Sequence, residues 1–149
     1  MAVNIGKLAI SSPDIASLQR IGEEFSAAGG NRIPRLEVAG LPPGTVELSI
    51  ILHDPDAPMP HGFTHWVVHG MPAFEGPVAA KVARTGPNAM GENSYVGPFP
   101  PPGHGTHHYY FWVYALDAHV AGNPSREEFL ETYASNIIEQ ARFVATFSV

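Results

Sequence analysis

Residues 97–114 read G-P-F-P-P-P-G-H-G-T-H-H-Y-Y-F-W-V-Y, a loop that leads directly into a strand. Four prolines among the first six residues fix φ and remove backbone N–H donors, so the loop is expected to be stiff. Glycines at positions 97, 103 and 105 allow backbone angles that other residues rarely adopt. The mostly aromatic run at residues 109–116 is typical of a strand.

Three histidines, His104, His107 and His108, stand where this loop meets the strand. Imidazoles held at a strand end by a stiff loop would form a small, preorganised pocket. A turn that only carries solvated histidines explains the same residues. This stretch alone leaves both interpretations open.

Length and composition favour one folded domain over residues 1–149. The chain is 44% hydrophobic, and fifteen glycines and fifteen prolines separate its short apolar runs, which indicates a mostly β fold. The sequence has no cysteine and no apolar run near the roughly 18–20 residues that span a bilayer. Its first ten residues do not resemble a signal peptide. We therefore expect a cytoplasmic protein without stable membrane insertion.

Charge excludes two classes of partner. The formal net charge is −6, and the eight lysines and arginines are scattered singly. Nucleic acids and anionic membranes are bound by basic surfaces, so neither is expected as a partner. The eight histidines predict a response to pH between about 5 and 7.

Short apolar or alternating runs predict strands at residues 7–12, 36–38, 46–53, 63–71 and 143–149. Residues 73–84 are expected to form a loop or a short strand. Ser125 and Glu128 form a capping box, which opens a helix predicted over residues 126–141. Residues 12–30 are ambiguous, but apolar side chains at nearly helical spacing favour a helix there.

Two carboxylates follow the predicted strand at 46–53 at once, as Asp54 and Asp56 in the sequence D-P-D-A-P. Carboxylates at the end of a buried strand predict contacts with a ligand. Asp and Pro also build tight turns, which is a purely structural explanation. Both interpretations stay open at this point.

His61, His65 and His69 recur four residues apart. On a helix this spacing would direct them toward one metal ion, whereas on a strand successive ones lie about 13 Å apart. The composition of the segment favours a strand, so no metal site is expected. Alternation along that strand places Phe63, His65, Val67 and His69 on one face.

Asp54, His65 and His107 stand at or near the ends of three predicted strands. If they meet, protonated imidazoles would bind a phosphate or carboxylate through charge-assisted hydrogen bonds. The same three groups could instead carry out acid–base chemistry. The sequence contains no G-x-S-x-G, Walker A or H-E-x-x-H motif, so it gives no support to nucleophile or nucleotide mechanisms.

Three motifs occur in order: D-P-D-A-P, F-T-H-W-V-V, and Y-V-G-P-F-P-P-P-G-H-G-T-H-H-Y-Y-F-W-V-Y-A-L-D. Together with N-R-I-P-R-L-E-V-A-G-L-P-P-G-T they resemble the phosphatidylethanolamine-binding proteins, nearest to the bacterial and archaeal branch called Raf kinase inhibitor-like. The resemblance covers residues 12–147. It implies a Greek-key β-sandwich of antiparallel sheets with a C-terminal helix and few other helices, and an extended, turn-like segment at residues 21–30.

The resemblance also implies that Asp54, His65 and His107 converge on a small cavity. In similar proteins this cavity accepts phosphate, acetate and phosphorylethanolamine head groups. The ligand-binding residues that it predicts here are Asp54, Asp56, Pro58, Phe63, His65, Tyr95, Gly97, Phe99, Pro101, His107 and Tyr109.

The chain departs from the family pattern around this cavity. Residues 71–86 form a shorter segment than in many bacterial members, and G-P-N-A at 86–89 replaces G-R-N-D. Phe99 stands where similar proteins often carry a small residue or cysteine, and Asn136 where microbial members often carry histidine. Phe99 beside Phe63 favours a less polar ligand.

We therefore expect a binding protein for a small anionic or phosphorylated molecule, with no cofactor. The alternative is an enzyme that uses Asp54, His65 and His107 for acid–base catalysis, such as a cyclisation, isomerisation or hydrolysis of a small, less polar substrate. The sequence does not separate the two, because both need the same imidazoles. Kinase regulation does not transfer on a resemblance of fold. The resemblance favours a homodimer.

Overall fold

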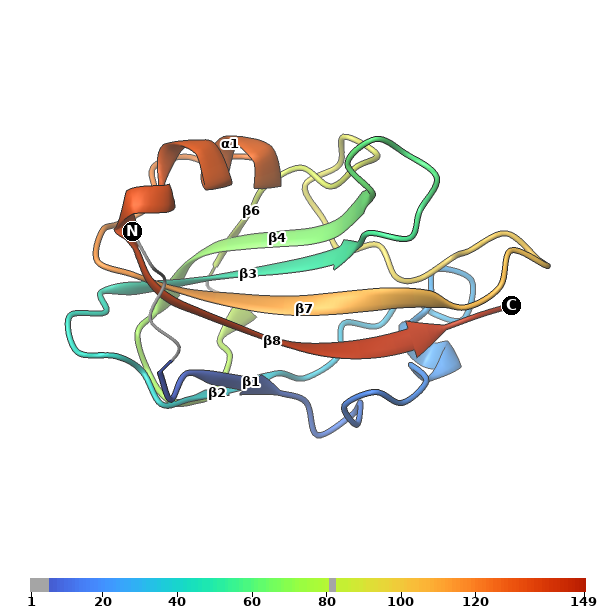
Figure 1. Ribbon diagram of the computed structural model, residues 1–149, viewed down its shortest axis with the longest axis horizontal. Helices are drawn as coiled ribbons and strands as arrows, with labels where there is room; N and C mark the ends of the chain where they lie inside the picture. Colours follow the sequence, from blue (N-terminus) through green and yellow to red (C-terminus); the bar gives the residue numbers. More distant parts are fainter. Residues whose placement is uncertain (1–5, 81–82) are drawn as a thin grey trace.

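The computed structural model describes residues 6–80 and 83–149, in which two antiparallel sheets are found (Figure 1). The larger sheet has the strand order β6-β4-β3-β7-β8, and the smaller one has the order β1-β2-β5. Residues 1–5 of the N-terminal stretch lie outside the described residues. So do residues 81 and 82 of the loop predicted at 73–84.

The strands of the larger sheet are β3 (Glu47–Asp54), β4 (Phe63–Pro72), β6 (Arg84–Thr85), β7 (His107–Leu116) and β8 (Ile137–Phe147). Those of the smaller sheet are β1 (Ala9–Ser11), β2 (Glu37–Ala39) and β5 (Gly76–Pro77). Helix α1 spans Arg126–Thr132, and among the described residues Glu23–Phe25 and Ala134–Asn136 form single 3-10 turns. The prediction of a mostly β fold with two antiparallel sheets and a C-terminal helix is confirmed.

The larger sheet is covered on both faces. Successive residues of β3 pack on opposite faces of the sheet. Ile50 packs in one hydrophobic cluster with Val38 of the smaller sheet, and Ile51 packs in another with Phe129 of α1. Every residue of β3 is buried. Burial on both faces explains why this strand is a continuous apolar run and lacks the alternation of a strand with one face in water.

The helix predicted over residues 126–141 is wrong in its second half. Helix α1 ends at Thr132, and β8 begins at Ile137. β8 pairs with β7 along its whole length, from Ile137 opposite Leu116 to Phe147 opposite His107. This long-range ladder outweighs the helical spacing of apolar residues, which is a weak local preference. The strand predicted at 143–149 is only the second half of β8.

The helix favoured at residues 12–20 is also wrong. Leu18 has a φ of 64° and is 71% exposed, which no amphipathic helix face would allow. The backbone N–H groups of Leu18 and Ile21 donate to the carbonyl oxygens of Val144 and Thr146 in β8, at 2.6 and 2.8 Å. Bonds to the edge of β8 thus replace the i→i−4 bonds of a helix. Residues 21–30 are turn-like apart from one 3-10 turn, in agreement with the resemblance.

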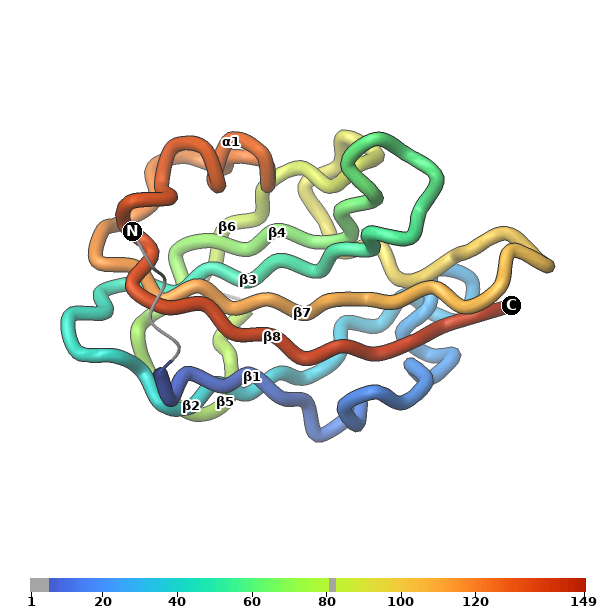
Figure 2. The backbone as a smooth tube through the Cα atoms, viewed as in Figure 1, coloured from blue at the N-terminus to red at the C-terminus, as the bar shows by residue number. Residues whose placement is uncertain are grey.

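Two loops meet at one end of the larger sheet. Figure 2 shows the green loop after β3 and the yellow-orange loop before β7 at the same end of the molecule. The second loop is anchored where the backbone N–H of Gly97 donates to Asn31 Oδ1 at 2.7 Å and the carbonyl of Pro98 accepts from Ala27 at 3.0 Å. A Cβ atom at position 97 would lie 2.0 Å from the carbonyl oxygen of Phe25. Glycine is required there because two backbone segments approach closely.

Replacing Gly97 with alanine is expected to lower the free energy of unfolding by about 1–3 kcal/mol, because a backbone carbonyl cannot move aside without undocking the loop. Gly22→Ala is the matched control. Its backbone is already in a region open to alanine (φ −65°), and its new Cβ would come too close only to the flexible end of Glu24, while the Phe25 ring would lie at an ordinary contact distance of 3.5 Å. Urea denaturation of both variants tests this, and equal midpoints would contradict it.

Candidate functional site

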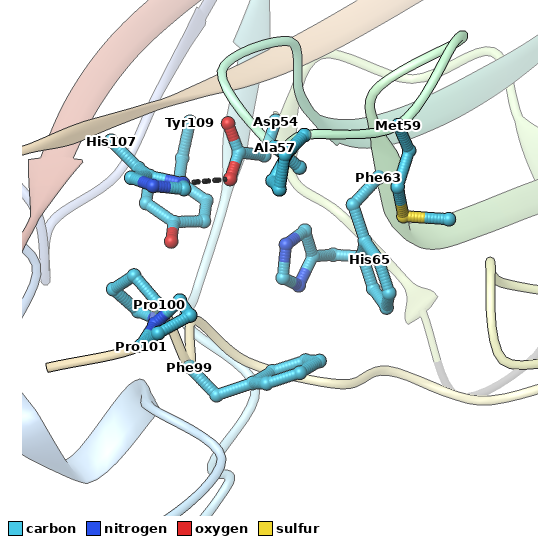
Figure 3. Close-up of a pocket in the computed structure, with 11 residues that line it drawn as sticks. Asp54, Ala57, Met59, Phe63, His65, Phe99, Pro100, Pro101, His107 and Tyr109 are labelled. Carbon is cyan, nitrogen blue, oxygen red and sulfur yellow. Dashed lines mark hydrogen bonds and ion pairs between the residues drawn. The ribbon is translucent and has the colours of Figure 1, made fainter. Parts of the chain in front are cut away.

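A cavity of about 260 Å³ opens between these two loops (Figure 3). It is lined by Asp54, Ala57, Pro58, Met59, Phe63, His65, Phe99, Pro100, Pro101, His107 and Tyr109. The walls are therefore mostly apolar, and the polar groups come from the sheet. The three residues singled out as a trio in the sequence, Asp54, His65 and His107, all lie in this lining.

Asp54 and His107 form a buried pair across the end of the sheet. Asp54 ends β3 and His107 begins β7, and the imidazole Nδ1 lies 2.7 Å from Asp54 Oδ2. Their side chains are 3% and 4% exposed. Asp54 Oδ1 also accepts a hydrogen bond from the backbone N–H of Asp56 at 2.8 Å. Asp54 thus caps a turn, as the structural explanation requires, and it also lines the cavity, whereas its contact with a ligand stays a prediction.

A β-bulge places His65. The register between β3 and β4 pairs Leu52 with Trp66 and His53 with Thr64, which leaves His65 without a partner. Such an extra residue bends a strand and changes the direction of its side chains.

The bulge makes one sequence prediction wrong. His65 does not share a face with Val67 and His69, as strict alternation required. Its ring lies 5.2 Å from that of Tyr109 on the cavity side. Val67 packs in the cluster that contains Phe129 of α1, and the ring of His69 lies 5.0 Å from that of Phe129.

Burial keeps His65 neutral. The side chain is enclosed, and loss of solvation lowers its pKa to about 4. Its Nδ1–H donates to the carbonyl oxygen of Val96 at 2.7 Å. Nε2 has no hydrogen-bond partner among the described residues, and the ring lines the cavity. At neutral pH His65 therefore presents a hydrogen-bond acceptor to the cavity.

Tyr109 supplies the complementary donor. The residue is 1% exposed, and burial raises the pKa of its hydroxyl well above the ordinary value, so the group stays protonated. The hydroxyl has no hydrogen-bond partner within the described part of the chain. Figure 3 shows its oxygen turned toward the side on which Pro100 and Pro101 lie. A neutral O–H donor and a neutral nitrogen acceptor thus line one cavity.

Aromatic and methionine side chains form the rim. Phe63 and Phe99 meet edge to face, with ring centroids 5.2 Å apart, and the ring of His65 lies 4.6 Å from that of Phe63. Phe99 is 43% exposed and Met59 is 46% exposed, so both keep apolar surface at the mouth. This rim is suited to contact with the less polar part of a ligand.

Three predicted site residues do not line the cavity. The Asp56 carboxylate accepts from His108 on the outer side. The hydroxyl of buried Tyr95 donates to the carbonyl oxygen of Phe25 at 2.7 Å. Gly97 serves the loop docking described above. Each of them positions a segment beside the cavity.

The cavity is also lined by Ala57, Met59 and Pro100, which were not predicted from the sequence. All three stand next to residues that were predicted, so taking each loop as a continuous wall would have found them. His104 was named among the histidines of a possible pocket but not among the predicted ligand-binding residues, and its Nδ1 atom lies 2.6 Å from His107 Nε2. Among residues 6–80 and 83–149, no group of three His, Cys, Asp or Glu side chains is placed to hold a metal ion.

Comparison with known proteins agrees with this architecture. The family model described as phosphatidylethanolamine-binding protein matches residues 11–148. The crystal structure of the family homologue CT736 of Chlamydia trachomatis matches with a TM-score of 0.88 at 27% identity, covering 97% of this chain and 99% of that one. Escherichia coli YbcL matches with a TM-score of 0.86 at 27% identity, covering 95% and 98% of the two chains.

Sequence relatives extend the agreement. The UPF0098 protein PH1269 of Pyrococcus horikoshii is 36% identical over 139 residues, which cover 85% of this chain and 70% of that protein. LppC of Mycobacterium tuberculosis, which is named as a lipoprotein, is 36% identical over 146 residues, covering 94% and 72%. The chain belongs to the phosphatidylethanolamine-binding protein family, and this membership supports a ligand-binding protein in general.

The described residues include no helix that is long and apolar enough to cross a membrane. Because one relative is named as a lipoprotein, the cytoplasmic location stays a prediction.

Stability should fall as the pH drops from 7 to 5. Burial lowers the pKa of His53 and His65 to about 4, and it also lowers that of His69. The unfolded chain takes up protons near the ordinary pKa of about 6.5, before these folded-state groups do, so acid favours unfolding. We expect His65 to contribute a loss of about 2 kcal/mol between pH 7 and pH 5, with further losses of the same sign from His53 and His69.

Urea denaturation of the wild type and His65→Gln at both pH values measures this. Between pH 7 and pH 5, His65→Gln should lose less unfolding free energy than the wild type, by the amount that His65 contributes. His61 is exposed, so the His61→Gln control should lose as much as the wild type. An identical loss in wild type and His65→Gln would contradict the buried, neutral state of His65.

Proposed function

We propose that this protein binds a small molecule whose single acidic head group, a carboxylate or a phosphate, enters the cavity beside His65 and Tyr109. The observation that carries the proposal is the pairing of a neutral nitrogen acceptor with a neutral O–H donor in one mostly apolar cavity. An acidic oxygen group can use both at once: one oxygen accepts from Tyr109, and the other shares a proton with Nε2 of His65.

This arrangement differs from a site built of two imidazolium ions. His65 is neutral in the free protein, because burial lowers its pKa to about 4. The anion therefore brings a proton with it, or takes one from water, and the complex holds that proton between His65 and the head group. Binding is coupled to proton uptake.

The lining residues favour a head group of low charge. They include no lysine or arginine, which are the usual partners of doubly charged phosphates. The carboxylate of Asp54 is already engaged by His107. The family is named for a phosphorylated lipid head group, which supports an acidic oxygen group as the recognised chemistry. A carboxylate or a singly charged phosphate ester meets both conditions.

The rim favours a ligand with a less polar body. Phe63, Phe99 and Met59 lie at the mouth, and the last two keep more than two fifths of their surface exposed. Burying that surface against a ligand is favourable by about 25 cal/mol per Å². We infer that the body of the ligand covers Phe99 and Met59 while its head lies deeper.

Acid–base catalysis is the second candidate, because the open Nε2 lone pair of His65 is also what a general base requires. The cavity lining contains no serine, cysteine or lysine, so covalent catalysis through these nucleophiles has no support there. Chemical change of a bound ligand, lost in His65→Gln, would favour the enzyme. Saturable binding without change favours the binding protein.

Phenylacetate should bind about thirtyfold more tightly than acetate, because its ring covers the apolar rim. NMR titration of the histidine and aromatic signals measures both affinities. Phe99→Ala should reduce this preference to below about tenfold, since part of the contact surface is lost. Phe74→Ala is the matched control, because Phe74 is 75% exposed and does not line the cavity. An unchanged preference in Phe99→Ala would rule out the body site at the rim.

The affinity for methanesulfonate, a singly charged anion that does not titrate near neutrality, should weaken as the pH rises from 5 to 7. The sign follows from the low free-state pKa of His65: the bound anion raises that pKa, so each binding event takes up a proton. The expected slope is up to about tenfold per pH unit. His65→Gln should flatten the profile, and an affinity independent of pH in the wild type would refute proton-coupled binding.

A further inference from the structure

His107 has both of its ring nitrogens engaged within the protein. Nδ1 lies 2.7 Å from Asp54 Oδ2, and Nε2 lies 2.6 Å from Nδ1 of His104. A carboxylate can only accept, so Nδ1 of His107 carries the hydrogen, and in the neutral ring Nε2 accepts from His104. The three side chains form a continuous hydrogen-bonded chain from a buried carboxylate to an exposed imidazole.

An imidazole offers only two hydrogen-bonding positions. Nδ1 of His107 is directed at buried Asp54, so a head group in the cavity can reach this ring only at Nε2. That position is filled by His104. We propose that His104 is an internal ligand of the site: its Nδ1–H occupies the Nε2 lone pair of His107, the position at which a head group would bind together with the proton that it shares with the ring. This inference rests on the proposed function.

The loop around His104 is built for such an exchange. His104 is exposed and lies between Gly103 (φ 77°) and Gly105 (φ 84°), and a Cβ atom added to either glycine would meet no atom within 4 Å. The tip therefore has free space and permissive backbone on both sides of the histidine. One turn bond, from the N–H of His104 to the carbonyl oxygen of Pro101 at 3.1 Å, holds its base. The tip can swing without disturbing the docked part of the loop near Gly97.

His108 provides an internal comparison. It is also an exposed histidine at the start of β7, but its backbone N–H and Nδ1 both bond to Asp56 Oδ2, at 2.8 and 2.7 Å. Asp56 and His108 are absent from the cavity lining. Removing the His108 side chain deletes the hydrogen bond of another exposed histidine at the start of β7, in this case to a carboxylate, without touching His107.

The test compares wild type, His104→Ala and His108→Ala in NMR titrations with acetate and methanesulfonate at one pH. His104→Ala should bind both probes about fivefold more tightly, because the competing hydrogen bond is gone. His108→Ala should bind as wild type does. In the wild type, the ¹⁵N signal of His104 Nδ1 should also move to the position of an unbonded imidazole as the site saturates.

The outcomes separate this inference from the proposed function. If the wild type binds the probes and His104→Ala binds them with the same or a lower affinity, His104 does not compete for the site. The proposed function then still stands. Binding by His104→Ala where the wild type shows none supports both. Absence of saturable binding by either protein at millimolar probe overturns both.

Discussion

The pairing of β7 between β3 and β8 determines where the cavity forms. β7 is bonded along both edges, with His53 of β3 opposite Tyr110 and Phe147 of β8 opposite His107. A strand held on both sides cannot slip by one residue without turning its whole buried face outward. The register therefore fixes which side chains of β7 reach the cavity, and it brings His107 to Asp54 at the end of the neighbouring strand.

Desolvation then decides what chemistry the site can offer. A cavity lined by lysine or arginine carries a fixed positive charge and selects for charge alone. Here burial leaves His65 and Tyr109 neutral, with one accepting and the other donating a hydrogen bond. Under the proposed function, such a site would distinguish an acid from a neutral molecule by sharing a proton with it, and its selectivity would depend on the acidity of the ligand.

The sequence was sufficient for the main strands and for the family. β3, β4 and β7 were placed to within two residues, because burial imposes runs of apolar and aromatic residues on them. The bulge at His65 has no local signal, since it is a mismatch between two strands, and so the predicted alternation failed there. The helix predicted through Ile137 failed for the same reason: its apolar spacing is local, whereas the ladder to β7 is not. His104 was visible in the sequence, but its contact with His107 depends on the path of a turn.

The loop before β7 has a stiff, docked first half and a second half with a more permissive backbone. Its proline-rich first half, anchored through Gly97 and Pro98, holds Phe99 as a fixed part of the wall. Its second half has glycines on both sides of His104 and lies in open space. Under our proposals, shape selection of the ligand body rests on the proline-rich half, while access to Nε2 of His107 rests on the half in which glycines flank His104. Changes in the two halves would alter selectivity and affinity separately.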